Sequence, residues 1–158
     1  MVIGCRRNGC CMSKTVWFLT SNPGKLEEAQ HHFREIGIEV KRLSLEEDAI
    51  VEPQASDLET VARSKIAQAM NHVPHEGAMV LVEDAGLFVD ALDGFPGVYS
   101  SHAFSTIGNH GILRLLSHLI DDDFVRIKNL RSASYEAVAA LWDGNNVLIG
   151  RGVCKGSI

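Results

Sequence analysis

The fold is decided by the stretch Leu81-Val82-Glu83-Asp84-Ala85-Gly86-Leu87, where a short apolar run ends in two adjacent carboxylates and a glycine. The apolar run is typical of a buried strand, and such a strand gains nothing from consecutive acids. Neighbouring strand residues point to opposite faces, so both acids can reach one small site only if the strand ends and the backbone turns there. Gly86 permits that turn. The stretch predicts either a Mg²⁺ site completed by substrate phosphates or an acidic turn at the rim of a sheet.

Strand and helix patterns alternate on both sides of this stretch. Apolar runs predict strands at 15–20, 38–43 and 78–83, and a closing hairpin at 132–142 and 147–153 across Asp143-Gly144-Asn145-Asn146. Helical periodicity predicts helices at about 25–35 and 106–119, and a third that opens at the capping-box spacing Ser56-Asp57-Leu58-Glu59. The pattern predicts an α/β fold with a mixed central β-sheet flanked by helices.

The length of 158 residues fits one domain, which we expect to span residues 14–158. Residues 1–13 carry Cys5, Cys10 and Cys11 but no apolar signal segment, and we expect them to form a disordered extension. The cysteine spacing does not match a zinc site, so reduced thiols in a cytoplasmic protein are expected.

The formal net charge of −5 gives no general attraction for nucleic acid polymers or for anionic membranes. No apolar run approaches the roughly 20 residues that span a bilayer. A polyanion bound by this chain would therefore be small and held by a few local cations.

Such cations occur at the first predicted strand-to-helix turn, Ser21-Asn22-Pro23-Gly24-Lys25. Free N–H groups and the helix dipole favour an anion at this position, and Lys25 adds a full charge, although the same composition is typical of an ordinary helix start. Lys65 is a second candidate cation or a solvated helix residue. Glu52 is a further candidate acid or a simple loop carboxylate.

Together these residues resemble the inosine triphosphate pyrophosphatase family, also called Ham1-like. The resemblance rests on four blocks in order: residues 18–28, beginning Phe18-Leu19-Thr20-Ser21-Asn22; residues 52–65, ending Ala62-Arg63-Ser64-Lys65; residues 82–100, which include Gly94-Phe95-Pro96-Gly97-Val98-Tyr99-Ser100; and Thr106-Ile107-Gly108-Asn109-His110-Gly111-Ile112-Leu113. The match covers about residues 16–158, and the later blocks look most like archaeal members.

The resemblance implies hydrolysis of a nucleoside triphosphate to a monophosphate and pyrophosphate with Mg²⁺. It implies that Asp84 activates the attacking water, and that the metal is held by Glu52, Glu83 and Asp84. The residues implied to hold the triphosphate are Ser21, Asn22, Lys25 and Lys65.

Two departures from the family pattern qualify what the resemblance implies. Ala85 stands where the family usually has Ser or Thr, so one hydroxyl is missing beside the carboxylates. The sequence also stops before the family's base-recognition segment, which would leave the base preference open and expose apolar surface that favours a homodimer. The alternative hypothesis is a weakly active or inactive nucleotide-binding and assembly module. Against it stand the retained charges, since unpaired buried charges are costly to keep without a ligand.

Overall fold

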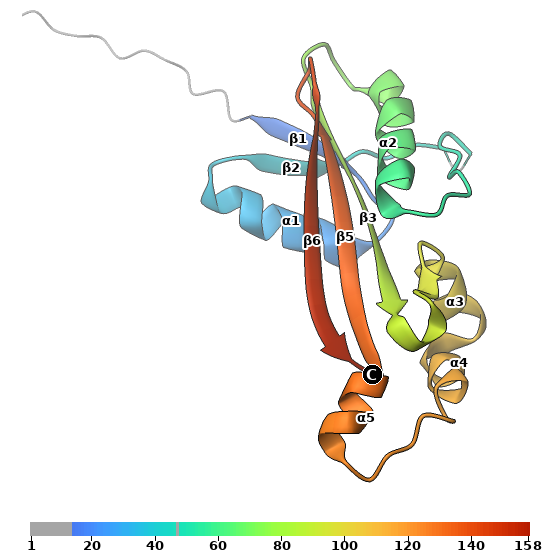
Figure 1. Ribbon diagram of the computed structural model, residues 1–158. Coiled ribbons are helices and arrows are strands. Elements are labelled where there is room, and N and C mark those ends of the chain that lie inside the picture. Colours follow the sequence, from blue (N-terminus) through green and yellow to red (C-terminus); the bar gives the residue numbers. More distant parts are fainter. Residues whose placement is uncertain (1–13, 47) are drawn as a thin grey trace, which may run out of the picture.

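The computed structural model describes residues 14–46 and 48–158, and the predicted N-terminal extension lies outside these residues. Its centre is one mixed sheet, whose strands are β1 Thr15–Leu19, β2 Glu39–Arg42, β3 Met79–Val89, β4 Pro96–Gly97, β5 Ser132–Trp142 and β6 Val147–Ser157. The strand order is β2-β1-β3-β5-β6, with the short β4 paired to β3 (Figure 1). The first three strands in that order run parallel, and β4, β5 and β6 pair antiparallel with their neighbours. The predicted mixed α/β fold is confirmed.

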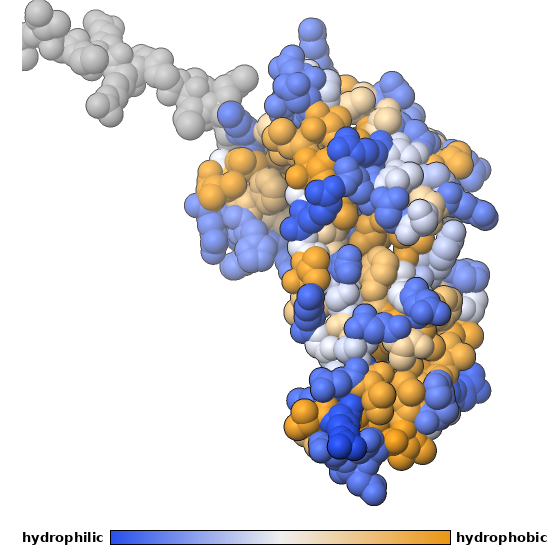
Figure 2. All heavy atoms as spheres, in the orientation of Figure 1, coloured by the Kyte–Doolittle hydropathy of each residue, from blue (hydrophilic) through white to orange (hydrophobic). Residues whose placement is uncertain are grey.

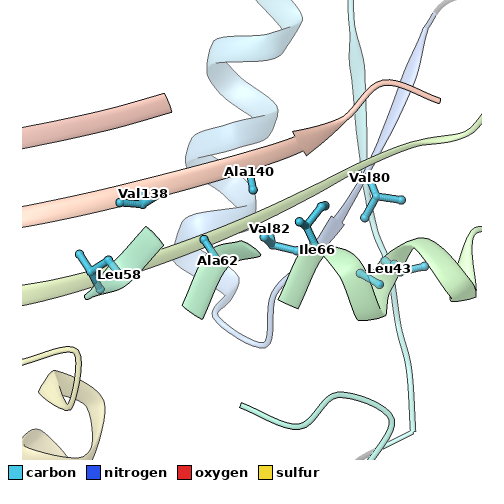
Figure 3. Close-up of a cluster of buried hydrophobic side chains, with 9 residues drawn as sticks. Leu43, Leu58, Ala62, Ile66, Val80, Val82, Val138 and Ala140 are labelled. Atoms are coloured by element: carbon cyan, nitrogen blue, oxygen red, sulfur yellow. The ribbon is translucent and has the colours of Figure 1, made fainter. Parts of the chain in front are cut away.

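Two helices cover opposite faces of the upper half of this sheet, which is the half where β1 and β2 pair alongside β3 (Figure 1). Helix α1 (Pro23–Glu35) packs on the face that presents Val16 and Leu81, whereas α2 (Leu58–Ala69) packs on the face that presents Val80 and Val82. Figure 3 shows the second of these cores, with α2 side chains over the strand residues. Because strand side chains alternate between faces, β3 is a buried central strand with a helix on each side.

The other helices lie at the far end of β3 and β5 (Figure 1). There Val89 and Ala133 pack with Ile112 and Leu116 in a third core. The helices are α3 Ser100–Thr106, α4 Gly108–Leu115 and α5 Phe124–Leu130, and single 3₁₀ turns occupy Met70–His72 and Asp90–Leu92. None of the helices in the described residues is long and apolar enough to cross a membrane.

The prediction that the carboxylate-bearing strand ends at Glu83 is wrong. β3 continues to Val89, and β5 pairs with it along the whole segment, including Glu83 and Asp84. Gly86 is therefore not a turn residue. A Cβ atom there would overlap the backbone carbonyl of Gly97 in β4, so the glycine allows a close approach of two backbones.

Four further features differ from the predictions. The single helix expected at 106–119 is two shorter helices, since Gly108 has φ +62° and interrupts α3 and α4. Helix α5 was not predicted; Asp123 begins it by accepting hydrogen bonds from Val125 and Arg126. The N-cap of α2 is Asp57 rather than Ser56, and β6 extends four residues beyond its predicted end at 153.

Candidate active site

The turn after β1 presents Lys25 to the first carboxylate. The Asn22 side chain caps α1, accepting hydrogen bonds from the N–H groups of Gly24 at 2.9 Å and Lys25 at 3.4 Å. This leaves the amide NH₂ of Asn22 available to a ligand, beside the exposed Ser21. From the first turn of α1, the Lys25 ammonium lies 2.6 Å from Glu83 Oε2. The structure thus groups Ser21, Asn22, Lys25 and Glu83.

The second carboxylate faces the opposite side of the sheet. Lys65, from α2, places its Nζ 2.7 Å from Asp84 Oδ2 and 2.6 Å from Glu52 Oε1. The Lys65 and Asp84 side chains are only 15% and 18% exposed, whereas Glu52 is 67% exposed. One ammonium group therefore holds a half-enclosed strand carboxylate and a loop carboxylate together.

The charge on Lys65 is stabilised by these two partners. Burial alone would lower the Lys65 pKa, but the hydrogen bonds and negative charges of Asp84 and Glu52 outweigh it, so the pKa lies above its ordinary value. The Asp84 Oδ2 atom is buried, and the Lys65 ammonium is the described group that contacts it.

The two clusters meet at an interruption in the sheet. β1 pairs with β3 as far as Val82, and β4 begins to pair with it at Leu87. Among the described strands, only β5 pairs with the intervening residues 83–86. We call this four-residue segment the β3 window. A ligand lying in it can contact side chains from both faces of the sheet.

Ser100 lies at the border of the window where β4 begins to pair with β3. The sequence alone assigns it no role. Its side chain is buried, and its Oγ accepts a hydrogen bond from Leu87 N–H at 2.8 Å and donates one to the Gly97 carbonyl at 2.7 Å. The available signal was a hydroxyl residue immediately after the Pro-Gly-Val-Tyr turn, within a block that carries the family resemblance.

The residues described do not contain a group of three His, Cys, Asp or Glu side chains placed to share one metal ion. Glu52 and Asp84 converge on Lys65, whereas Glu83 contacts Lys25 on the other face. A metal held here by protein would thus have at most two adjacent carboxylates. That number suits Mg²⁺, which commonly takes one or two carboxylates and completes its shell with water and substrate phosphates.

Comparison with known proteins identifies the family to which this arrangement belongs. The model of the Ham1 family matches residues 16–158. The chain belongs to the Ham1 family. It is 42% identical over 135 residues to the dITP/XTP pyrophosphatase of Thermococcus kodakarensis, covering 85% of this chain and 65% of the relative. It is 37% identical over 148 residues to the enzyme of that name from Ignicoccus hospitalis, covering 93% and 71%.

Solved structures of Ham1 proteins share the fold. The Staphylococcus aureus Ham1 protein aligns with a TM-score of 0.67 at 25% identity, covering 92% of this chain and 72% of that one. A nucleoside-triphosphatase, or dITP/XTP pyrophosphatase, of Mycobacterium abscessus aligns with a TM-score of 0.66 at 26% identity, covering 91% and 74%. The chain spans slightly less than two thirds of the Thermococcus relative and 51% of the Pyrococcus horikoshii one.

Proposed function

We propose that the chain hydrolyses a nucleoside triphosphate to a nucleoside monophosphate and pyrophosphate, with purine substrates such as dITP or XTP. The observation that carries the proposal is the Lys65–Asp84 pair at the β3 window, with Lys25 on the opposite face. A triphosphate needs cations along its length, and the window allows lysines from two faces to reach one ligand. The names of the archaeal relatives support the substrate class.

In this proposal Ser21, Asn22, Lys25 and Lys65 hold the triphosphate. Asp84 is the catalytic residue: it takes a proton from the attacking water, whose oxygen forms a bond to the α-phosphorus. The bond from the α-phosphorus to the oxygen bridging the α and β phosphates then breaks, and pyrophosphate leaves with both bonding electrons. Transfer of a proton to a positioned carboxylate typically contributes about 10²–10⁴-fold to such a rate.

Glu52, Glu83 and Asp84 are the proposed protein ligands of Mg²⁺. The buried Oδ2 of Asp84 and the nearby carboxylate of Glu52, which both contact Lys65, are oxygen donors of the kind that a hard cation takes. Bound Mg²⁺ would neutralise negative charge on the phosphates as it develops. Glu83 faces the α1 side of the sheet. It would therefore join the other two carboxylates only when the bound metal and triphosphate extend across the β3 window.

The experiment is to measure pyrophosphate release with Mg²⁺ from ITP, dITP, XTP and the common triphosphates. We expect ITP, dITP and XTP to be preferred over the common triphosphates, and Asp84→Asn to lower kcat by about 10²–10⁴-fold with a smaller change in KM. The matched control is Asp90→Asn, which makes the same chemical change just beyond β3 and should leave kcat within about twofold.

Absence of release from every substrate, combined with nucleotide binding, would support the alternative of an inactive binding module. Equal kcat values for the parent and Asp84→Asn would remove Asp84 from the catalytic role.

The proposal includes a cytoplasmic homodimer. Within the described residues the single cysteine, Cys154, is an exposed free thiol, and free thiols are typical of proteins in a reducing compartment. The far end of the sheet exposes many apolar side chains, which are the support for self-association.

A further inference from the structure

Lys65 occupies the position between two carboxylates that a divalent cation would need. Its Nζ lies 2.6 Å from Glu52 Oε1 and 2.7 Å from Asp84 Oδ2, so a single positive charge already bridges both oxygens. We propose that Lys65 acts as a built-in substitute cation, which keeps divalent metal out of the free chain and makes the metal and the triphosphate bind cooperatively. This inference rests on the proposed function. It adds that the metal binds tightly only together with the triphosphate, and not to the free chain.

The charges at the site give the first reason. An ammonium group and a divalent cation repel each other strongly at contact distance, and the Lys65 and Asp84 side chains are too enclosed for water to screen that repulsion fully. Metal can enter only if Lys65 moves from the two carboxylates. Without another anion, that movement would leave the enclosed ammonium unpaired, which is costly.

A triphosphate removes this obstacle because it carries its own negative oxygens. They can accept the Lys65 ammonium while the carboxylates turn to the metal. They also supply the ligands that two carboxylates cannot, since Mg²⁺ prefers six oxygens. Each ligand therefore improves the site for the other, and by linkage the gain in affinity is equal in both directions.

The opposite face provides an internal comparison. Lys25 lies 2.6 Å from Glu83, but the contact involves one carboxylate only. Removing Lys25 deletes one positive charge, as removing Lys65 does, but frees no pair of carboxylates. The two variants have the same change in net charge and differ in whether a two-carboxylate metal site is uncovered.

The test measures metal binding without catalysis. Free Mn²⁺, used as a probe for Mg²⁺, is titrated by electron paramagnetic resonance against the parent chain, Lys65→Met and Lys25→Met. Each titration is run with and without an α,β-methylene nucleoside triphosphate, which resists hydrolysis at the relevant bond. For the parent we expect the protein to bind Mn²⁺ at least tenfold more tightly with the analogue, after correction for Mn²⁺ bound by the analogue alone.

Without the analogue, Lys65→Met should bind Mn²⁺ at least tenfold more tightly than the parent. The Mn²⁺ affinity of Lys25→Met should stay within about threefold of the parent value. The added substitution Asp84→Asn should abolish the gain of Lys65→Met. Lys65→Gln provides a second form of the variant if Lys65→Met does not fold, as judged by thermal unfolding.

The proposal is overturned if the parent binds Mn²⁺ equally well with and without the analogue. It is also overturned if folded Lys65 variants bind Mn²⁺ no better than Lys25→Met. These outcomes are separate from failure of the proposed function, because pyrophosphate release by the parent is measured independently of metal binding to the free chain.

Discussion

Asp57 shows how one exposed carboxylate anchors the helix that carries Lys65. It accepts a hydrogen bond from the Thr60 N–H at 2.8 Å and another from Thr60 Oγ1 at 2.7 Å, and so satisfies the first turn of α2. The backbone hydrogen bond from Thr60, followed by the side-chain one, holds the Asp57 pKa below its ordinary value of 3.8. Its ionised form is therefore favoured by folding.

We predict that Asp57→Ala lowers the unfolding temperature by about 2–5 °C at pH 7. A lowered pKa stabilises the fold fully above 3.8, and this contribution is lost as the pH falls through the lowered pKa in the folded chain. The curves of unfolding temperature against pH for the parent and Asp57→Ala should thus converge in acid. Asp57→Asn, which keeps an acceptor but no charge, should show less pH dependence than the parent. Parallel parent and Asp57→Ala curves down to pH 2 would contradict this role.

The sequence predicts which residues form the site better than it predicts which of their side chains contact one another. Alternation along a strand correctly places Glu83 and Asp84 on opposite faces, but the expectation of one shared site required a turn that the chain does not make. The partners depend on which helix covers which face. That arrangement is set by tertiary packing, which local periodicity does not contain. Sequence reasoning misses Ser100 for the same reason, because the hydrogen bond that ties it to β3 comes from Leu87, which is brought beside it by the tertiary fold.

At the scale of elements, β3 links the site to the rest of the fold. It pairs with β1 and β5 in the upper half and with β4 and β5 in the lower half. Its upper half is predictable from an apolar run. The lower half begins with two acids and a glycine, and this local sequence predicts a turn instead of a strand. The long β5–β6 hairpin supplies the pairing that overrides this local preference.

We predict that Gly86→Ala destabilises the chain by about 1–3 kcal/mol, because the added methyl group must displace the Gly97 carbonyl. The matched control is Gly150→Ala on β6, where no atom lies within 4 Å of an added Cβ. It should change stability by less than about 0.5 kcal/mol. Urea unfolding of the three proteins measures both values, and equal values for the two variants would show that β3 and β4 can separate at no cost.

For the whole molecule, the most distinctive surface lies over α4 and α5, which we call the apolar end. Figure 2 shows apolar residues gathered at the lower end of the view. Charged residues flank them: 121–123 are acidic, whereas Arg126 and Lys128 lie within α5. Two copies related by a twofold axis could pair the acids of one with the bases of the other. The exposed apolar residues include Leu113, Leu115, Ile120, Phe124, Val125 and Leu130.

We predict that light scattering at micromolar concentration gives twice the monomer mass for the parent, and that Phe124→Glu gives the monomer. Ile36→Glu is the matched control, since Ile36 and Phe124 are both 69% exposed but Ile36 lies at the end of α1. It should remain dimeric. A monomeric parent would exclude the dimer, and a dimeric Phe124→Glu would exclude the apolar end as its interface.

The β3 window also determines how freely the chain can vary beside its carboxylates. Leu87 donates its N–H to Ser100 and not to β5. Because the direction of the backbone N–H groups alternates along an antiparallel strand, the N–H of Ala85, two residues earlier, also points away from β5. It therefore points into the window. The side chain at position 85 can change without moving that donor. A mutation from serine or threonine to alanine would remove a hydroxyl and leave the backbone group in place. Only proline, which has no N–H, would delete it.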